Sequence, residues 1–269
     1  MRQIELQDPL GVVEVASYLL AQARQWGLSI KISSDFQALR DLRLAVRQSV
    51  ISPMFDPEIS GLDETTGFWM GAYDASGRCV ALNAFRLDKV EPNLSHWALG
   101  WMVGLYMRRS ELIVPSHLNP PAGSRAEKVR GRVAYHGEAW IDPKNLRVRE
   151  AVEVLPLLGM VLAFIKWSPD AIWAVGNEAM ATRGLYARFG YPLVERSFLR
   201  WEWLPDGAEA VEWLALIERN DLEFVIQERL AAKARIGKTQ ITEIFTGAST
   251  EATETPLIPF GKRMGKMTL

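Results

Sequence analysis

Residues 184–191 read Gly-Leu-Tyr-Ala-Arg-Phe-Gly-Tyr and form the most specific stretch of the sequence. They end a helical pattern that begins at Glu178 and continues to Phe189. Gly190 follows where glycine, which adopts a left-handed backbone without strain, commonly terminates a helix. An alternating pattern over residues 194–204 comes next. The stretch therefore predicts a helix that stops at Gly190 and leads into a β-strand.

The same alternation of strand and helix precedes this stretch. Residues 131–141 form a strand candidate, and residues 149–167 are apolar on most sides, which is typical of a helix packed against a sheet. Pro156 is expected in the first turn of that helix or at a kink. The apolar run at 171–175 is typical of a buried strand. Together these patterns predict a sheet covered by helices.

The N-terminal half supplies further helices and a hairpin. Apolar residues recur at helical spacing over 12–26 and 35–50. Two apolar runs within 67–87 flank a turn signal, which predicts a β-hairpin. Residues 94–107 have helical spacing and belong to an expected insertion at about 90–130. The predicted fold class is therefore α/β in the broad sense (α+β), with a mixed, largely antiparallel central sheet flanked by helices.

Three segments are expected along the chain. Residues 1–205 are predicted to form one domain that includes the insertion. Helical patterns at about 208–218 and 222–234 predict a helical extension over 206–236. Residues 237–269 have few periodic apolar residues and are expected to form an extended C-terminal arm or tail.

The composition excludes several classes of function. A formal net charge of -1 and a pI near 6.4 argue against a protein that mainly binds a nucleic-acid backbone or an anionic membrane. Cys79 is the single cysteine and there are 3 histidines, so neither an intramolecular disulfide nor a metal site is expected. The N-terminus lacks a secretory signal pattern, and no apolar run approaches the roughly 18 residues that span a bilayer. A cytoplasmic location is expected.

Residues 133–203 resemble the core of the GNAT superfamily of N-acetyltransferases. Members of this family carry a strand, a cofactor-binding helix, a strand, a further helix and a closing strand in this order. The stretch from Leu185 to Tyr191 resembles the family signature Leu-Tyr-x-x-x-Gly-Phe, with Tyr191 in place of the final Phe. The resemblance implies a GNAT-like fold and an acyl-CoA-dependent N-acyltransferase, with acetyl-CoA or another acyl-CoA as the donor substrate.

The same resemblance implies roles for particular residues. Tyr186 matches the Tyr of the signature and is implied as the general acid that protonates the departing thiolate, a task that suits a neutral phenol. The backbone near Trp140 and Ile141 is implied to bind the thioester oxygen, because the two neighbouring strands splay apart there in the family. The other implied cofactor-binding residues are Arg147, Arg149 and Asn177.

The sequence departs from the family in the loop that cradles the pyrophosphate of coenzyme A. Glu150 and Val152 stand where the family has a glycine and a second small residue. A carboxylate opposes the negative charge of the ligand, and a β-branched side chain hinders close approach of the backbone. Two hypotheses stay open: Arg147 and Arg149 compensate for these changes, or the chain no longer binds coenzyme A.

Glu138 and His136 are the candidates for a catalytic base. They lie two residues apart on the predicted strand, so they are expected to share one face of the sheet. Either could accept the proton of the acceptor amine, directly or through water. The first helices, the hairpin and the insertion are expected to line the side of the sheet that binds this acceptor, an amine of a small molecule or protein.

Two alternatives to an acyl-CoA-dependent enzyme remain from the sequence. The first is a catalytically inactive GNAT-like binding or scaffold protein, whose C-terminal extension is a candidate for homodimer contacts. The second is an acyltransferase with an acyl carrier protein donor, as in the homoserine-lactone synthases. Phe55, Asp56, Asp63 and Arg86 carry a faint likeness to that group. Neither nucleic acid nor a membrane is an expected partner.

Overall fold

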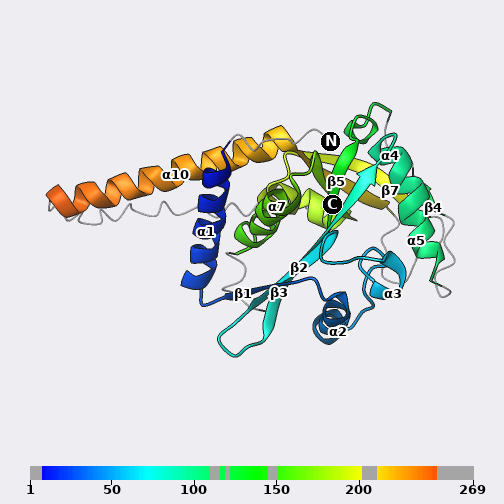
Figure 1. Ribbon diagram of the computed structural model, residues 1–269, viewed down its shortest axis with the longest axis horizontal. Coiled ribbons are helices and arrows are strands. Elements are labelled where there is room, and N and C mark those ends of the chain that lie inside the picture. Colours follow the sequence, from blue (N-terminus) through cyan, green and yellow to red (C-terminus); the bar gives the residue numbers. More distant parts are fainter. Residues whose placement is uncertain (1–7, 110–115, 119–121, 145–150, 202–210, 247–269) are drawn as a thin grey trace, which may run out of the picture. The chain divides into compact units, whose positions relative to one another are not determined.

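The first part of the chain forms a single mixed sheet. The computed structural model describes residues 8–109, 116–118, 122–144, 151–201 and 211–246. The chain divides into two compact units, Met1–Leu230 and Ala231–Leu269, and the first contains an 8-stranded sheet in the order β1-β2-β3-β5-β6-β8-β7-β4 (Figure 1). All neighbouring strands are antiparallel except the parallel pair β5 and β6. The predicted fold class is therefore confirmed.

The strands and helices follow the chain in this order. The strands are β1 Ser29–Ser33, β2 Gly67–Tyr73, β3 Cys79–Val90, β4 Ser116–Leu118, β5 Gly131–Ile141, β6 Ala171–Asn177, β7 Leu193–Trp201 and β8 Val211–Glu218. The first helices are α1 Pro9–Gln25, α2 Phe36–Arg47, α3 Pro57–Ser60, α4 Leu94–Trp97, the π-helical turn η1 Ala98–Met102 and α5 Val103–Met107. The later helices are the short 3₁₀ turn η2 Arg125–Glu127, α7 Val154–Trp167, α8 Glu178–Thr182, α9 Leu185–Phe189 and α10 Arg219–Thr246, which spans both units.

Helices cover both faces of the sheet in the first unit. α1 and α7 contact each other on one face, and their apolar residues share a core cluster with α9 (Figure 1). α2, α4 and α5 supply the core of the opposite face, where Trp173 of β6 is completely buried. α2 begins where the sequence indicates, because the Asp35 side chain accepts a hydrogen bond from the Ala38 N–H at 3.0 Å.

Most local predictions are confirmed. The helices at 12–26 and 35–50, the hairpin, the helical insertion and the strand at 131–141 are all present. Pro156 lies in the first turn of α7, which begins at Val154 rather than at residue 149. The single helix predicted over 178–189 is two short ones, because Gly184 adopts a left-handed backbone with φ 69° between them.

The prediction of a helix at about 208–218 is wrong. Residues 211–218 form β8, which lies between β6 and β7 at the centre of the C-terminal half of the sheet. Residues 214–217 are buried and alternate between the core clusters of the two faces, and a short apolar run of that kind does not distinguish a strand from a buried helix. The domain therefore extends past residue 205, and helix α10 continues through 237–246, where an extended arm was expected. Residues 247–269 lie outside the described ranges.

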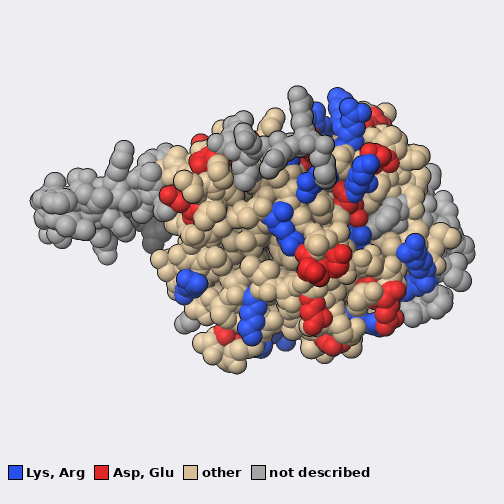
Figure 2. Space-filling model, in the orientation of Figure 1, with Lys and Arg blue, Asp and Glu red and all other residues tan. Residues whose placement is uncertain are grey.

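Two surface properties bear on partners. None of the helices within the described ranges is long and apolar enough to cross a membrane. Figure 2 shows basic and acidic side chains interspersed over the face turned to the viewer. On this face, the part of the chain that the structure describes carries no large patch of one sign, which agrees with the near-zero net charge.

Candidate active site at the gap between β5 and β6

The two parallel strands separate after three residues of pairing. β5 pairs with β6 from Val133 to Tyr135, opposite Ala171 to Trp173. Both strands then continue, β5 to Ile141 and β6 to residue 177, without further pairing to each other. The edge of β5 that faces β6 is therefore open beyond Tyr135. The sequence resemblance implied a splay of this kind.

A β-bulge in β5 shapes the open edge. Leu82 of β3 pairs with Trp140, and Ala84 pairs with Gly137, so two residues of β5 stand opposite one residue of β3. Glu138 lies in this bulge and has a positive φ of 53°. Such a backbone is uncommon for a residue with a side chain and needs support from its surroundings.

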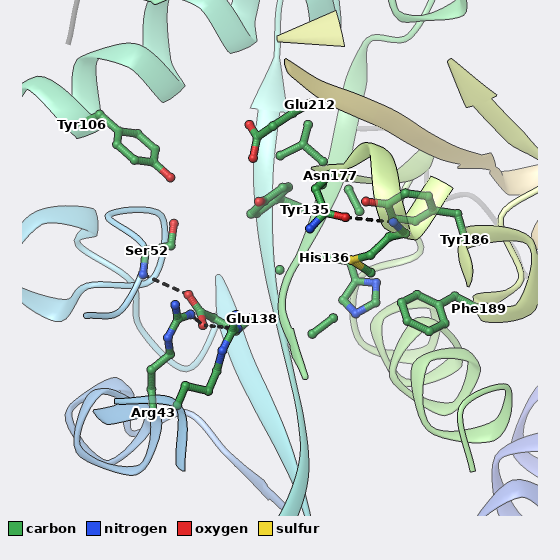
Figure 3. A pocket seen from close by; sticks show the side chains of 17 residues that line it. Arg43, Ser52, Tyr106, Tyr135, His136, Glu138, Asn177, Tyr186, Phe189 and Glu212 are labelled. Atoms are coloured by element: carbon green, nitrogen blue, oxygen red, sulfur yellow. Dashed lines mark hydrogen bonds and ion pairs between the residues drawn. The ribbon is translucent and has the colours of Figure 1, made fainter. Parts of the chain in front are cut away.

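The bulge places Glu138 and His136 on opposite faces of the sheet, so the prediction that they share one face is wrong. The period of two along a strand is broken by the extra residue. Figure 3 shows Glu138 directed toward Ser52 and Arg43, whereas His136 is directed toward Phe189 on the other side of β5. The two side chains therefore cannot be alternative bases for the same amine.

Glu138 is buried and anchored as a carboxylate. It forms an ion pair with Arg43 of α2, and Arg47 lies 3.8 Å away. Its second oxygen accepts a hydrogen bond from the Ser52 N–H at 2.9 Å. These contacts give the carboxylate a counter-charge and tie the bulge to α2. They also leave it poorly placed to accept a proton from a substrate.

His136 is neutral and fully engaged. Its Nδ1 lies 2.8 Å from the Tyr191 hydroxyl, and its Nε2 lies 2.9 Å from Oδ1 of Asn83. Its ring stacks on Phe85 with centroids 4.5 Å apart. Burial lowers the pKa of His136 to about 3, so its ring is uncharged at neutral pH. The tyrosine that replaces the final Phe of the family signature thus has a structural partner in His136.

Tyr186 lies at the gap, and its hydroxyl group forms no hydrogen bond with any of the described residues. The residue is 2% exposed, and α9 carries its side chain toward β6. A Cβ atom at Gly176 of β6 would collide with the hydroxyl, so the glycine allows the close approach. Burial, and then the charge of Glu212, raise the pKa of Tyr186, which therefore keeps its proton at neutral pH. A buried donor without a partner is rare and indicates a missing ligand or water.

Two cavities lie on either side of this gap. The α2-side cavity has a volume of about 220 Å³ and is lined by residues of α2, α5, β5, β6, α8, α9 and β8 (Figure 3). The α7-side cavity has a volume of about 500 Å³ and is lined by the end of β5 and by α7, α8 and α9. Ala139, Met180 and Phe189 line both cavities, so the two cavities adjoin at these side chains.

The structure distributes the other predicted site residues between these cavities. Trp140 and Ile141 line the α7-side cavity, together with Val152 from the predicted phosphate loop. Asn177 lines the α2-side cavity, and its Oδ1 accepts a hydrogen bond from the Met180 N–H at 2.8 Å, which caps α8. Arg147, Arg149 and Glu150 lie outside the described residues.

Five polar residues are among those of the α2-side cavity that sequence reasoning missed. Arg43 and Arg47 belong to the polar side of an amphipathic helix, a pattern that normally indicates solvent exposure. Glu212 lies on β8, which the sequence analysis placed in a helix. The remaining two are Ser52 and Tyr106. The only available signal for Tyr106 was its position in the insertion.

Comparison with known proteins gives matches to solved structures alone: no protein-family model matches the sequence, and no curated protein does. A GNAT family acetyltransferase from Staphylococcus aureus Mu50 is 11% identical, with a TM-score of 0.38 over 71% of this chain and 99% of that chain. A spermidine N-acetyltransferase mutant from Vibrio cholerae is 12% identical, with a TM-score of 0.38 over 73% of this chain and 96% of that one. A GNAT family N-acetyltransferase from Escherichia coli, in complex with CoA, is 15% identical, with a TM-score of 0.37 over 72% of this chain and 83% of that one.

The likeness is one of fold. The order of β5, α7, β6, α8 with α9, and a closing strand is the GNAT-like order that the sequence predicted. An inserted strand, β8, lies between β6 and that closing strand.

Proposed function

We propose that the chain is an acyl-CoA-dependent N-acyltransferase, in its simplest form an acetyltransferase, that acts on an amine. One observation carries this proposal: the Tyr186 hydroxyl is buried, with no hydrogen-bond partner among the described residues, at a gap between parallel strands where two cavities adjoin. A proton donor in that position suits a reaction in which a ligand from one cavity reacts with a ligand from the other.

The α7-side cavity suits the donor. Its lining near the gap is mainly apolar and includes Trp140, Ile141 and Val152, which fits the uncharged arm of coenzyme A. The open edge of β5 offers backbone groups that β6 does not pair, and such groups can bind the amides of that arm and the thioester oxygen. The thioester supplies an activated acyl group with a thiolate leaving group.

The residues at the gap then account for the protons of the transfer. The amine must first lose one proton to become a nucleophile. Its nitrogen forms a bond to the acyl carbon, and the carbon–sulfur bond breaks. Tyr186 donates its hydroxyl proton to the departing sulfur and regains a proton from the nitrogen, which keeps one as an amide. The overall products are an amide, a free thiol and one proton.

A titration with coenzyme A and acetyl-CoA tests the proposal. We expect binding to the wild-type protein and to Tyr186→Phe, because the substitution removes only the hydroxyl. With an amine acceptor, the kcat of Tyr186→Phe should fall about 10²-fold, at the lower end of general acid catalysis. Tyr18→Phe is the matched control, since Tyr18 lies on α1 and its hydroxyl contacts only Gln22 among the described residues.

The outcome that contradicts the proposal is specific. It is the absence of heat and of thermal stabilisation at millimolar acetyl-CoA, combined with no release of thiol in the presence of a broad amine panel. Arg147→Glu provides a further check, because loss of binding in that variant would assign the phosphates to the predicted loop.

A second candidate is a binding protein that keeps the fold without the reaction. Two observations favour it: Val152 occupies the α7-side cavity where the family has a small residue, and Glu138 is tied to Arg43 rather than free to act as a base. This candidate predicts that acyl-CoA does not bind, although ligands of the α2-side cavity still do. The same titration separates the two functions.

A further inference from the structure

The α2-side cavity carries opposite charges in different parts of its wall. Arg43 and Arg47 enter it from α2, and Glu212 enters it from β8, opposite Asn177 in the strand register. Figure 3 shows Arg43 below Tyr135 and Glu212 above it in the view. A ligand with a negative group at one end and a positive group at the other matches this arrangement of charges.

The arginine end has an excess of positive charge. Two guanidinium groups share the single carboxylate of Glu138, with Arg43 in contact and Arg47 at 3.8 Å. The Nε of Arg43 is buried and has no hydrogen-bond partner among the described residues. Burial lowers the pKa of Arg43 to about 10, which still leaves it charged at neutral pH. An unused donor beside surplus positive charge suits a carboxylate.

The Glu212 end has negative charge close to Tyr186. Oε2 of Glu212 accepts a hydrogen bond from Nε1 of Trp201 at 3.1 Å. The charge of Glu212 adds to burial in raising the pKa of Tyr106 to about 12, and it also acts on Tyr186. Glu212, Tyr106 and Tyr186 all line this cavity. A cationic amine in this part of the cavity would lie close to the proposed proton donor.

The volume of the cavity limits the size of the ligand. At about 220 Å³ it is smaller than the pockets of about 300–1,000 Å³ that hold drug-sized molecules. The occupant must therefore be small, or must enter with only one end. Side chains of both signs leave little room for a purely apolar ligand, since burial of unpaired charge is costly.

We propose that the α2-side cavity binds a small amine that also carries a carboxylate, with Arg43 and Arg47 on the carboxylate and Glu212 on the ammonium group. The role of this molecule as acyl acceptor rests on the proposed function. Glu212 then accepts the first proton of the ammonium group, and the neutral amine faces the gap. This assignment supplies the base that His136 and Glu138 do not.

Direct binding in the absence of acyl donor tests the assignment. The probes are the common α-amino acids and linear ω-amino acids, each compared with the amine that lacks the carboxylate and the acid that lacks the amine. We expect at least one amino acid to bind 10-fold or more tightly than both of its matched compounds. Equal binding of the amine and the amino acid, or no binding by any probe, would overturn the proposal.

Paired variants locate the two ends. Arg47→Gln should weaken binding of the amino acid about 10-fold and leave the matched amine unchanged. Arg40→Gln is its control, because Arg40 lies on the same helix with 34% of its side chain exposed, against 32% for Arg47, and does not line the cavity. Glu212→Gln should weaken the amino acid and the amine but not the acid. Glu218→Gln, at the far end of β8, is the control.

A turnover assay separates failure of this inference from failure of the proposed function. If amino acids bind as expected but no acyl-CoA reacts with them, the proposed function fails and the binding site stands. If amines are acylated equally well with and without a carboxylate, the proposed function stands and the assignment of Arg47 is overturned. Loss of the amino acid preference in Arg40→Gln as well as in Arg47→Gln would also overturn it.

Discussion

His136 makes the folding stability dependent on pH in a way that can be calculated. Its pKa is lowered from the ordinary value of 6.5 to about 3, because burial of the ring disfavours the charged form. The unfolded chain therefore takes up a proton at a higher pH than the folded chain does. The contribution of His136 to stability is complete above about pH 6.5 and is lost progressively as the pH falls toward 3.

The size of the effect follows from the difference in pKa. Each pH unit between the two values costs about 1.4 kcal/mol of unfolding free energy. At pH 5, about 1.5 units below the unfolded value, the wild-type protein should have lost about 2 kcal/mol through this one group relative to pH 8. Urea unfolding at both pH values measures the change, which includes other titrating groups.

A variant isolates the share of His136. In His136→Gln the drop between pH 8 and pH 5 should be smaller than in the wild type by about 2 kcal/mol, although the variant starts from a lower stability because two buried hydrogen bonds are altered. His96→Gln, which replaces an exposed histidine, should keep the wild-type drop. Parallel pH profiles for the wild type and His136→Gln would refute the reasoning. If the variant does not fold, the NMR signal of the His136 ring in the folded wild type provides the test. Titration of that signal above pH 5 would refute the reasoning.

Two further predictions concern residues at the gap, and a third concerns the buried Cys79 of β3. Glu138→Gln should lower the unfolding free energy by about 3 kcal/mol, because it leaves the buried guanidinium of Arg43 without its counter-charge, and chemical denaturation checks this. Gly176→Ala should lower kcat about 10²-fold, as in Tyr186→Phe, while the protein stays folded, since the added methyl group displaces the Tyr186 hydroxyl; an unchanged kcat would contradict it. Cys79 should resist a thiol reagent at pH 8 in the native protein and react at once in denaturant, because burial raises its pKa to about 11.

The sequence predicted those parts of the fold that depend on local patterns. α1 and α2 have helical spacing and ends marked by capping residues, and β2 with β3 surrounds a clear turn signal. β8 was missed because it lies between β6 and β7 in the sheet, so it is covered on both faces. A short apolar run does not reveal this tertiary arrangement. β4, with three residues, is too short to give a pattern.

The candidate site was predictable only in part. Tyr186 came from its position in a motif, and the structure places it at the gap. The opposite orientations of Glu138 and His136 depend on one extra residue in β5. Gly137, a glycine inside the strand pattern, is a signal for a bulge that the sequence analysis did not use. Arg43 and Arg47 have the pattern of a solvated helix surface, yet they line a cavity beside Glu138, which the bulge turns toward them.

The ion pair of Glu138 explains how such a bulge persists. A residue with φ of 53° costs about 1–3 kcal/mol, so its neighbours must stabilise the conformation. The Ser52 N–H and Arg43 hold the carboxylate from outside the sheet, and this keeps the bulge at the point where β5 leaves β6. The same contacts that prevent Glu138 from acting as a base therefore maintain the opening beside Tyr186. In the proposed enzyme, Glu138 is a positioning residue, and the proton of the amine must go to another group on the cavity wall, for which Glu212 is the candidate.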